Sequence, residues 1–280
     1  MSDKRLRDEE VPGLFRDGMT IGIGGWGSRR KPMALVRALI RSGVRGLTIV
    51  SFGGADVGML CATGQAARVV HGFVSLDTIA IEPHFAAARV AGTIRNTDLD
   101  EAMLVSGLRA AAHRLPFEVT RAGLGSDAVL RNPDIQMIRS PYADGEELVA
   151  MPAIPLDLAL IHVDRADERG NGQVLGDDLF FDDLFAAAAD VTIMSAESVV
   201  PSLAAEPLHS LVIPRLNVSH VVEAPQGAAP TACLPAYPRD EAFQKMYAAA
   251  VGDWNAFASR YANVTHDEFS RAYAAFGEAS

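Results

Sequence analysis

The sequence predicts an α/β fold in which a mostly parallel sheet is flanked by helices. Short runs rich in valine and isoleucine alternate with segments where alanine, leucine and arginine recur at helical spacing. This alternation is typical of parallel strands joined by crossover helices. The 280 residues contain no internal repeat and no low-complexity linker. We therefore expect a single α/β domain over residues 1–280, with a helical extension over about residues 238–280.

The first part of the chain alternates strands with helices. Residues 19–24 ("MTIGIG") and 47–54 ("LTIVSFGG") are short apolar runs, which favour strands. Between them, residues 32–43 have apolar residues at helical spacing, a proline near the start and a glycine after the end, which is typical of a helix. A third strand is predicted over residues 68–76, followed by a helix over residues 98–115 that stops before a proline.

The second part continues this pattern and then becomes helical. Strands are predicted over residues 158–167 and 191–198, with a helix over residues 178–190 between them and extended chain over residues 210–225. The tail is amphipathic over residues 240–262, so we expect it to pack on the body or on a partner. Its apolar stripe, which we interpret as packing rather than as a pocket, comprises Phe243, Tyr247, Trp254 and Phe257.

Composition excludes several classes of protein. A net charge of −10 leaves no basic stripe to neutralise phosphates, which argues against a nucleic-acid binder. The two cysteines, Cys61 and Cys233, form no CxxC motif and no His/Cys cluster at metal spacing, so we expect no metal and a reducing compartment. The charged N-terminus lacks the apolar core of a signal peptide, and no apolar run approaches the roughly 20 residues that span a bilayer. We expect a cytoplasmic protein.

A glycine-rich turn follows the first strand. Residues 22–27 ("GIGGWG") fit GxGxxG, the spacing of a dinucleotide site. Such a site needs an acid at the tip of the second strand, but that strand ends in residues 51–54 ("SFGG"), and the first acid, Asp56, lies beyond the tip. Residues 29–31 ("RRK") also crowd the following helix start. The turn therefore does not predict a nicotinamide or flavin site.

The turn can still serve a ligand. A glycine-rich strand-to-helix turn exposes backbone N–H groups at a positive helix end, where they stabilise an oxyanion, a phosphate or a carboxylate. The alternative is a tight turn that needs glycine for steric reasons only. Ligands of open α/β sheets bind at strand ends. The substrate-binding candidates here are Gly24, Gly25, Trp26, Gly27, Ser51 and Gly53.

Four segments, in order, resemble the alpha subunits of class I CoA-transferases. They are "GGWG" with Pro32, residues 107–127 ("GLRAAAHRLPFEVTRAGLGSD"), residues 159–172 ("ALIHVDRADERGNG") and residues 222–243. The resemblance implies a NagB/RpiA/CoA-transferase-like fold, a beta subunit as partner in an α2β2 heterotetramer, and an acyl-CoA substrate. CoA is then part of the substrate, and no separate cofactor is implied.

Within that family, the variants "GWGSRRKPMALVRALIRS", "FVSLD", "RLPF…RAGLGS" and "FDDLF" are most similar to the branch of cholesterol ring-cleaving hydrolases. That branch is implied to open the last steroid ring of a cyclohexenone carboxyl-CoA thioester that bears a carboxyethyl side chain. Two alternatives remain open. The chain can be a subunit of a true acyl-CoA:carboxylate CoA-transferase, or a non-catalytic subunit whose chemistry lies in its partner.

Glu101 is the catalytic candidate. Aligning Arg109-Ala110 with the family's "RA" places Glu101 where transferases carry glutamine, which puts a general base in place of an amide. The nucleophilic glutamate of a transferase lies in a "SENG"-type element of the beta subunit, which an alpha subunit is expected to lack. Near Met103 and Leu104, Glu101 would be shielded and its pKa raised. Alternatively, it is a first-turn acid that stabilises a helix N-terminus.

Three arginines are candidates for binding a carboxylate. Guanidinium groups pair well with carboxylates, and the implied substrate carries an extra one. Arg29 and Arg30 lie at a helix start, where their charges oppose the helix dipole, so we expect an anionic partner. Arg121 is a further candidate, and the nearby Gly123 is a substrate-binding candidate with it.

Asn171 and three histidines complete the candidates. Asn171, between two glycines, predicts a left-handed turn, and its amide can reach a ligand. His71, His84 and His113 are interpreted as packed or capping residues.

Overall fold

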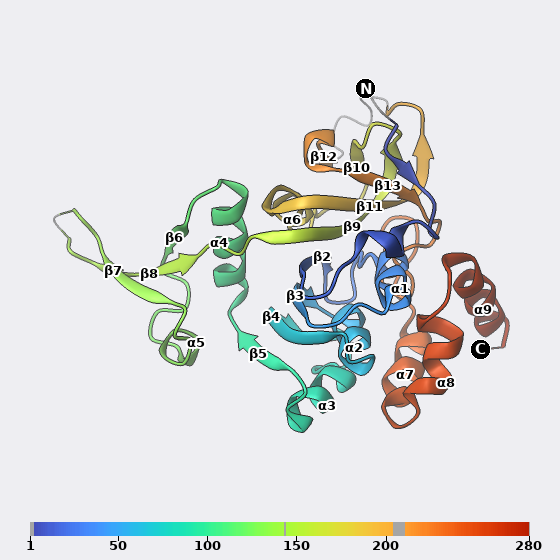
Figure 1. Cartoon of the computed structure of the whole chain (residues 1–280), viewed down its shortest axis with the longest axis horizontal. Coiled ribbons are helices and arrows are strands. Elements are labelled where there is room, and N and C mark those ends of the chain that lie inside the picture. The colour runs from blue at the N-terminus through green and yellow to red at the C-terminus, as the bar shows by residue number, and fades with distance from the viewer. Residues whose placement is uncertain (1–2, 143, 204–210, 280) are drawn as a thin grey trace.

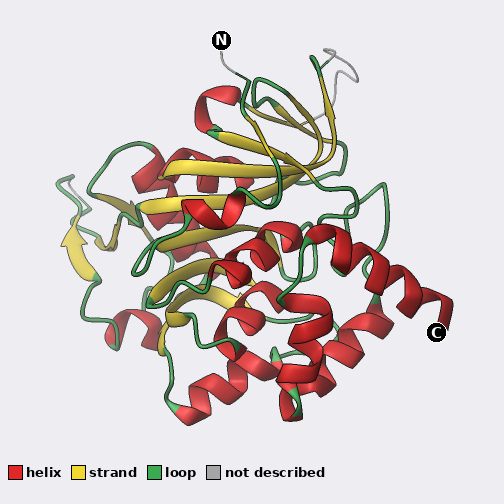
Figure 2. Cartoon of the chain, turned by 45° about the vertical axis from the view of Figure 1, so that its right-hand side comes forward, coloured by secondary structure: helices red, strands yellow, loops and turns green. Residues whose placement is uncertain are grey.

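A twisted, mostly parallel sheet forms the centre of the molecule (Figures 1 and 2). The computed structural model describes residues 3–142, 144–203 and 211–279. Within these residues the main sheet has ten strands, and all neighbours along its principal order pair in parallel. That order is β1 (Arg5–Leu6), β13 (His220–Glu223), β11 (Ala189–Val200), β9 (Leu156–Asp167), β2 (Thr20–Trp26), β3 (Leu47–Gly53), β4 (Ala66–Val74) and β5 (Arg95–Asp98).

The remaining two of the ten strands pair antiparallel beside β9. They are β10 (Gly172–Val174), which pairs with β9, and β12 (Leu211–Ile213), which pairs with β10. Strand order reverses between β2 and β9, because the chain runs from β2 toward β5 on one side and from β9 toward β13 on the other. Open α/β sheets bind ligands at the carboxyl ends of strands beside such a switch point.

Helices cover both faces of the sheet and give two cores (Figure 2). Side chains alternate along the strands, so that Ile49 packs into one core and Val50 into the other. The first core holds residues of a 3-10 turn (Val11–Leu14), α1 (Met33–Ser42), α2 (Ala55–Ala62), α3 (Pro83–Ala91), α7 (Glu241–Ala249), α8 (Trp254–Phe257) and α9 (His266–Ala279). The second holds residues of α4 (Glu101–Ala112) and α6 (Asp182–Ala188).

A small antiparallel sheet projects beyond α4 (Figure 1). It consists of β6 (Phe117–Thr120), β8 (Glu147–Pro152) and β7 (Gln136–Arg139), with the short helix α5 (Asp127–Leu130) nearby. The inner face buries Val149 and Met151 in the second core. These strands are not predicted from the sequence, because two of them are four residues long and largely exposed.

The α/β fold and most predicted elements are confirmed, and three segments differ. The helix predicted over residues 178–190 is shorter, Asp182–Ala188, because Phe180 and Phe181 have positive φ angles that a right-handed helix does not allow and the chain enters β11 at Ala189. The predicted extended chain over residues 210–225 is broken by a 3-10 turn (Arg215–Asn217). The predicted tail helix is interrupted by a 3-10 turn (Ala250–Gly252), and a π-helical turn (Ala258–Ala262) then leads toward α9. The interruption has a local cause, since Asp253 leaves the helix and caps α8 by accepting a hydrogen bond from the Ala256 amide. None of the described helices is long and apolar enough to cross a membrane.

The tail packs on the body, and the interpretation of its apolar stripe as packing is confirmed. Phe243 and Tyr247 are fully buried and Phe257 nearly so. The Tyr247 hydroxyl donates a hydrogen bond of 2.8 Å to Oε1 of Glu82, the residue that caps α3. Burial raises the pKa of Glu82 from 4.5 to about 7, although hydrogen bonds from the Phe85 amide and Tyr247 oppose the shift.

This carboxyl should make stability depend on pH. A carboxyl whose pKa is higher in the folded state than in the unfolded state contributes stability that is present below pH 4.5 and is lost as the pH rises through about 7. Glu82→Gln should therefore flatten the fall in the free energy of unfolding over this range, by on the order of 1 kcal/mol per pH unit. Urea unfolding at several pH values measures it. Glu241, an exposed glutamate at the start of α7, is the control, and Glu241→Gln should keep the original pH profile. An unchanged pH profile in Glu82→Gln would contradict the raised pKa of Glu82.

Candidate active site

Glu101 is the first residue of α4 and faces outward from the helix. Asp100 caps the helix by accepting a hydrogen bond of 2.7 Å from the Met103 amide. Met103 and Leu104 are fully buried in the second core, whereas the Glu101 side chain is exposed. The expected shielding of Glu101 by these two residues is therefore absent within this chain, because Glu101 stands at the exposed start of the helix while Met103 and Leu104 are buried in the core.

Glu101 borders a hollow of about 350 Å³ that we call the Glu101 hollow. Its other lining residues come from the glycine turn and from the loop before α6. They are Trp26, Arg29, Asp178, Phe180 and Phe181. The structure thus brings together three sequence-predicted site residues, Glu101, Trp26 and Arg29, and adds an aromatic pair that the sequence analysis missed.

A second hollow, of about 470 Å³, adjoins the first. The two hollows share Arg29, Asp178 and Phe180. The wall of this second hollow is mainly apolar and includes Leu175, Leu234 and Pro235. The shared residues make Arg29 and Phe180 the boundary between the two spaces.

Arg29 is anchored on one side and open on the other. Its guanidinium lies 4.6 Å from the centre of the Trp26 ring, a cation–π contact, and 3.4 Å from the Asp77 carboxylate. Its side chain is 38% exposed. The Arg29 guanidinium, held by Trp26 and Asp77, therefore lines both hollows.

Arg30 turns inward and is almost fully buried. Its guanidinium donates to the main-chain oxygens of His162, Asp178 and Leu179, at 3.1, 2.7 and 2.6 Å, and to the Asp182 carboxylate at 3.2 Å. The anionic partners expected for the two arginines thus lie within the chain, Asp182 for Arg30 and Asp77 for Arg29. Arg30 also lines the second hollow, but its side chain is almost fully buried and its guanidinium is bonded to protein groups, so substrate binding by Arg30 stays a prediction.

The glycine turn does not offer free amides to an anion. The amide of Gly25 donates to Asp182 Oδ1 at 2.7 Å, that of Trp26 to the Arg29 oxygen and that of Gly27 to the Phe52 oxygen. Helix α1 begins only at Met33, beyond the turn. The interpretation of the turn as an oxyanion site is therefore not supported by these contacts.

The steric interpretation of the turn is confirmed. Gly25 and Gly27 have φ angles of +73° and +58°, which favour glycine. Gly24 has no room for a side chain, because a Cβ there would lie 2.2 Å from Asp182 Oδ1.

Ser51 and Gly53 lie inside the protein rather than on either hollow. Ser51 Oγ contacts Lys31 Nζ and Asp56 Oδ2, each at 2.7 Å, and Lys31 and Asp56 form a fully buried ion pair at 3.1 Å. A Cβ on Gly53 would lie 2.8 Å from Val57. Lys31 and Ser51 support the glycine turn, since they donate hydrogen bonds to the main-chain oxygens of Gly25 and Ile23. Burial lowers the pKa of Lys31, and Asp56 opposes this shift.

Arg121, Gly123 and Asn171 also lie apart from the hollows. Arg121 is exposed beside the small sheet and pairs with Glu146 at 2.6 Å. A Cβ on Gly123 would lie 2.4 Å from Met103 Sδ, so this glycine permits close packing on α4. Asn171 is not left-handed, because Gly170 takes that conformation at φ +94°, and the Asn171 amide is bonded to Asp167 at 2.7 Å.

The interpretation of the three histidines is confirmed. His113 is the C-cap residue of α4. His84 stacks on Tyr247, and His71 contacts Asn96 Oδ1 at 2.7 Å.

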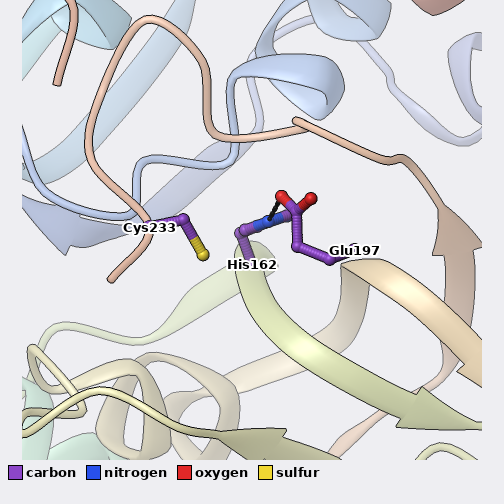
Figure 3. Close-up of side chains that lie close together, drawn as sticks. All are labelled: His162, Glu197 and Cys233. Atoms are coloured by element: carbon purple, nitrogen blue, oxygen red, sulfur yellow. Dashed lines mark hydrogen bonds and ion pairs between the residues drawn. The ribbon is translucent and has the colours of Figure 1, made fainter. Parts of the chain in front are cut away.

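A further cluster, missed by the sequence analysis, joins His162, Glu197 and Cys233 (Figure 3). These residues come from β9, β11 and a C-terminal loop, and their ligand-type atoms lie within 4.8 Å of one another. Only the parallel register of β9 and β11 brings the first two together, so sequence spacing carries no signal for them.

These groups fit a structural role better than a metal site. His162 uses both ring nitrogens, on Ser195 Oγ at 2.8 Å and Glu197 Oε1 at 2.9 Å, and the Tyr237 hydroxyl donates to Glu197. Burial raises the pKa of Cys233, which keeps its thiol protonated and a poor ligand. The cluster fastens the C-terminal loop to the sheet.

Comparison with known proteins places this geometry in a family. Residues 8–224 match the family model described as Coenzyme A transferase. The chain belongs to this family. It is 46% identical, over 99% of its length and 97% of the relative, to the cholesterol ring-cleaving hydrolase IpdA subunit of Rhodococcus jostii (strain RHA1), and 45% identical, over 99% of both chains, to that of Mycobacterium tuberculosis.

A solved structure supports the same assignment. Glutaconate coenzyme A-transferase from Acidaminococcus fermentans superimposes with a TM-score of 0.88, at 26% identity, over 96% of this chain and 92% of that chain. The prediction of a CoA-transferase-like fold, made from four short segments, is thus confirmed. In this CoA-transferase fold the Glu101 hollow lies beside the strand-order reversal, where β2 ends at Trp26.

The Asp182 contact should be critical for stability. Asp182→Ala leaves Arg30 buried without its carboxylate and the Gly25 amide without an acceptor, so we expect a loss of about 3–5 kcal/mol in the free energy of unfolding. Chemical denaturation measures the loss. Asp183→Ala, which removes the neighbouring carboxylate of the same first turn, should cost less than about 1 kcal/mol. Equal losses in the two variants would refute this role of Asp182.

Proposed function

We propose that this chain is the alpha subunit of a hydrolase that opens the last steroid ring of a cyclohexenone carboxyl-CoA thioester in bacterial steroid degradation. The observation that carries the proposal is an exposed carboxylate, Glu101, in one hollow with a held cation, Arg29, and aromatic rings. The IpdA subunits named above, similar over nearly the whole chain, support the same activity.

Glu101 acts as general base in this proposal. Its carboxylate takes a proton from water, and the oxygen adds to an electron-poor carbonyl carbon of the ring. The ring C–C bond then breaks, and its electron pair stays beside the thioester carbonyl as an enolate before protonation. CoA therefore remains on the product, and no cofactor or metal takes part.

Arg29 binds the carboxylate of the carboxyethyl side chain. It lies at the boundary of both hollows, so the ring can occupy the space beside Glu101 while the side chain reaches the guanidinium. Its ion pair with Asp77 is 3.4 Å long, whereas Arg239 pairs with the same Asp77 at 2.8 Å. Asp77 thus keeps a cationic partner when Arg29 turns to a substrate.

A partner subunit completes the site in this proposal. The IpdA relatives are named as subunits, and Glu101 is open to solvent in this chain. A beta subunit that covers the Glu101 hollow, in an α2β2 assembly, would exclude bulk water. The desolvation that a general base requires would then come from the second chain.

Glu101→Gln tests the base. We expect a loss of about 10²–10⁴-fold in kcat for ring opening by the assembled complex, because the amide cannot accept a proton from water. Release of the open-chain CoA product, followed by chromatography, measures the rate. Asp100→Asn should retain the rate, since asparagine also caps helices.

The same assay separates the alternatives. Full activity in Glu101→Gln would make this chain a non-catalytic subunit. Turnover only with an added carboxylic acid acceptor, with ping-pong kinetics, would instead make it a CoA-transferase subunit, the activity named for the glutaconate relative.

Arg29→Met tests the carboxylate contact. We expect KM for the substrate to rise about 10- to 100-fold, because a charge-assisted hydrogen bond is lost, with a much smaller change in kcat. The comparison substrate is the same ring thioester without its carboxyethyl group. On that substrate Arg29→Met and the original chain should have similar KM values; an equal rise on both substrates would contradict the contact.

A further inference from the structure

Two aromatic residues beside Glu101 have a strained backbone. Phe180 and Phe181 have φ angles of +50° and +63°, in the left-handed region that bulky residues rarely adopt. Such conformations cost free energy and persist only where the surrounding structure imposes them, typically at functional sites. The strained pair borders the Glu101 hollow.

Arg30 holds the chain on both sides of this pair. Its guanidinium bonds the main-chain oxygens of Asp178 and Leu179, immediately before the pair, and lies 4.9 Å from the centre of the Phe180 ring. It also bonds the carboxylate of Asp182, immediately after the pair. The planar guanidinium of Arg30 is thus bonded on both sides of the aromatic pair, in the loop over residues 178–181 and at the start of α6.

Held in this way, Phe180 and Phe181 line the same hollow as Glu101. The Phe181 ring packs on Phe52, with ring centres 5.2 Å apart, and 36% of the residue remains exposed. Phe52 in turn lies 6.2 Å from Phe73, whose ring meets that of Trp26 edge-on at 4.8 Å. A connected set of rings therefore supports the apolar side of the hollow.

We propose that Phe180 and Phe181 form an aromatic wall that selects alicyclic over straight-chain acyl groups, and that Arg30 is the positioning residue for this wall. A compact ring buries its face on a rigid wall without losing internal freedom, whereas a flexible chain must be ordered to do so. The inference rests on the proposed function, because it takes the Glu101 hollow as the acyl site.

Binding of two CoA thioesters tests the wall. Cyclohexanecarbonyl-CoA and heptanoyl-CoA have equal numbers of acyl carbons and differ in the ring, and calorimetry with the assembled complex gives a Kd for each. The original complex should prefer the cyclic ester. Phe181→Asn tolerates the left-handed backbone but lacks the ring, so we expect it to reduce the preference about 10-fold.

A matched control separates this effect from the loss of any exposed phenylalanine. Phe117, on the small sheet, is 39% exposed and lies outside both hollows. Phe117→Asn should leave the ratio of the two Kd values unchanged. An unchanged ratio of the two Kd values in Phe181→Asn would contradict the proposed aromatic wall.

Arg30→Lys tests positioning, since lysine keeps the charge and loses the planar fork. We expect the same loss of preference as in Phe181→Asn. A variant that only melts at lower temperature, with the original Kd ratio, would give Arg30 a purely structural role and overturn this part. If Arg30→Lys does not fold, Phe180→Asn replaces it, because Phe180 is the ring that the Arg30 guanidinium contacts. An unchanged ratio of the two Kd values in Phe180→Asn would contradict a role of Arg30 in selectivity through Phe180.

Glu101→Gln distinguishes failure of the wall from failure of the proposed function. This variant should keep the Kd ratio and lose ring opening. If the original complex, with Glu101 in place, shows the Kd ratio but does not open the ring, the proposed function is contradicted and the wall is supported. Ring opening together with an unaltered ratio in Phe181→Asn contradicts the wall alone.

Discussion

The buried contact between Asp182 and Arg30 is the constraint on which the rest of the site depends. The carboxylate accepts from the Gly25 amide through one oxygen and from the Arg30 guanidinium through the other. Burying two charges is costly, and burial raises the pKa of Asp182 to about 6 even though Arg30 opposes the shift. The pair is tolerated because further hydrogen bonds satisfy the guanidinium, and those same bonds fix the glycine turn against the loop before α6.

This constraint explains how residues far apart in sequence form one hollow. The turn after β2 supplies Trp26 and Arg29, the loop before α6 supplies Phe180 and Phe181, and α4 supplies Glu101. All three meet beside β2, where strand order reverses and where parallel sheets bind ligands. The fold positions the Glu101 hollow beside β2, and the contacts of Asp182 hold the turn and the loop that line it.

The sequence was sufficient for the fold, but not for the roles of the residues around Glu101. Hydrophobic periodicity predicted the strands, and the family resemblance made Glu101 a catalytic candidate, which stays a prediction. Nothing local distinguishes Arg29 from Arg30, because their roles depend on partners 48 and 152 positions away in the chain, Asp77 and Asp182. Asn171 failed as a left-handed residue for a local reason, since the preceding glycine adopts that conformation at lower cost.

The buried carboxylates contrast with Glu101. Asp182, Asp56 and Glu82 are fully buried, each is fixed by hydrogen bonds within the protein, and none of them lines either hollow. Glu101 is exposed, so water reaches it, and its own chain borders it on one side only, with the aromatic residues of the Glu101 hollow. In the proposed mechanism the exclusion of bulk water is completed from outside the chain, by the bound substrate ring, which packs on the aromatic wall, and by a partner subunit. Catalysis is then a property of the assembly, even though the base belongs to one chain.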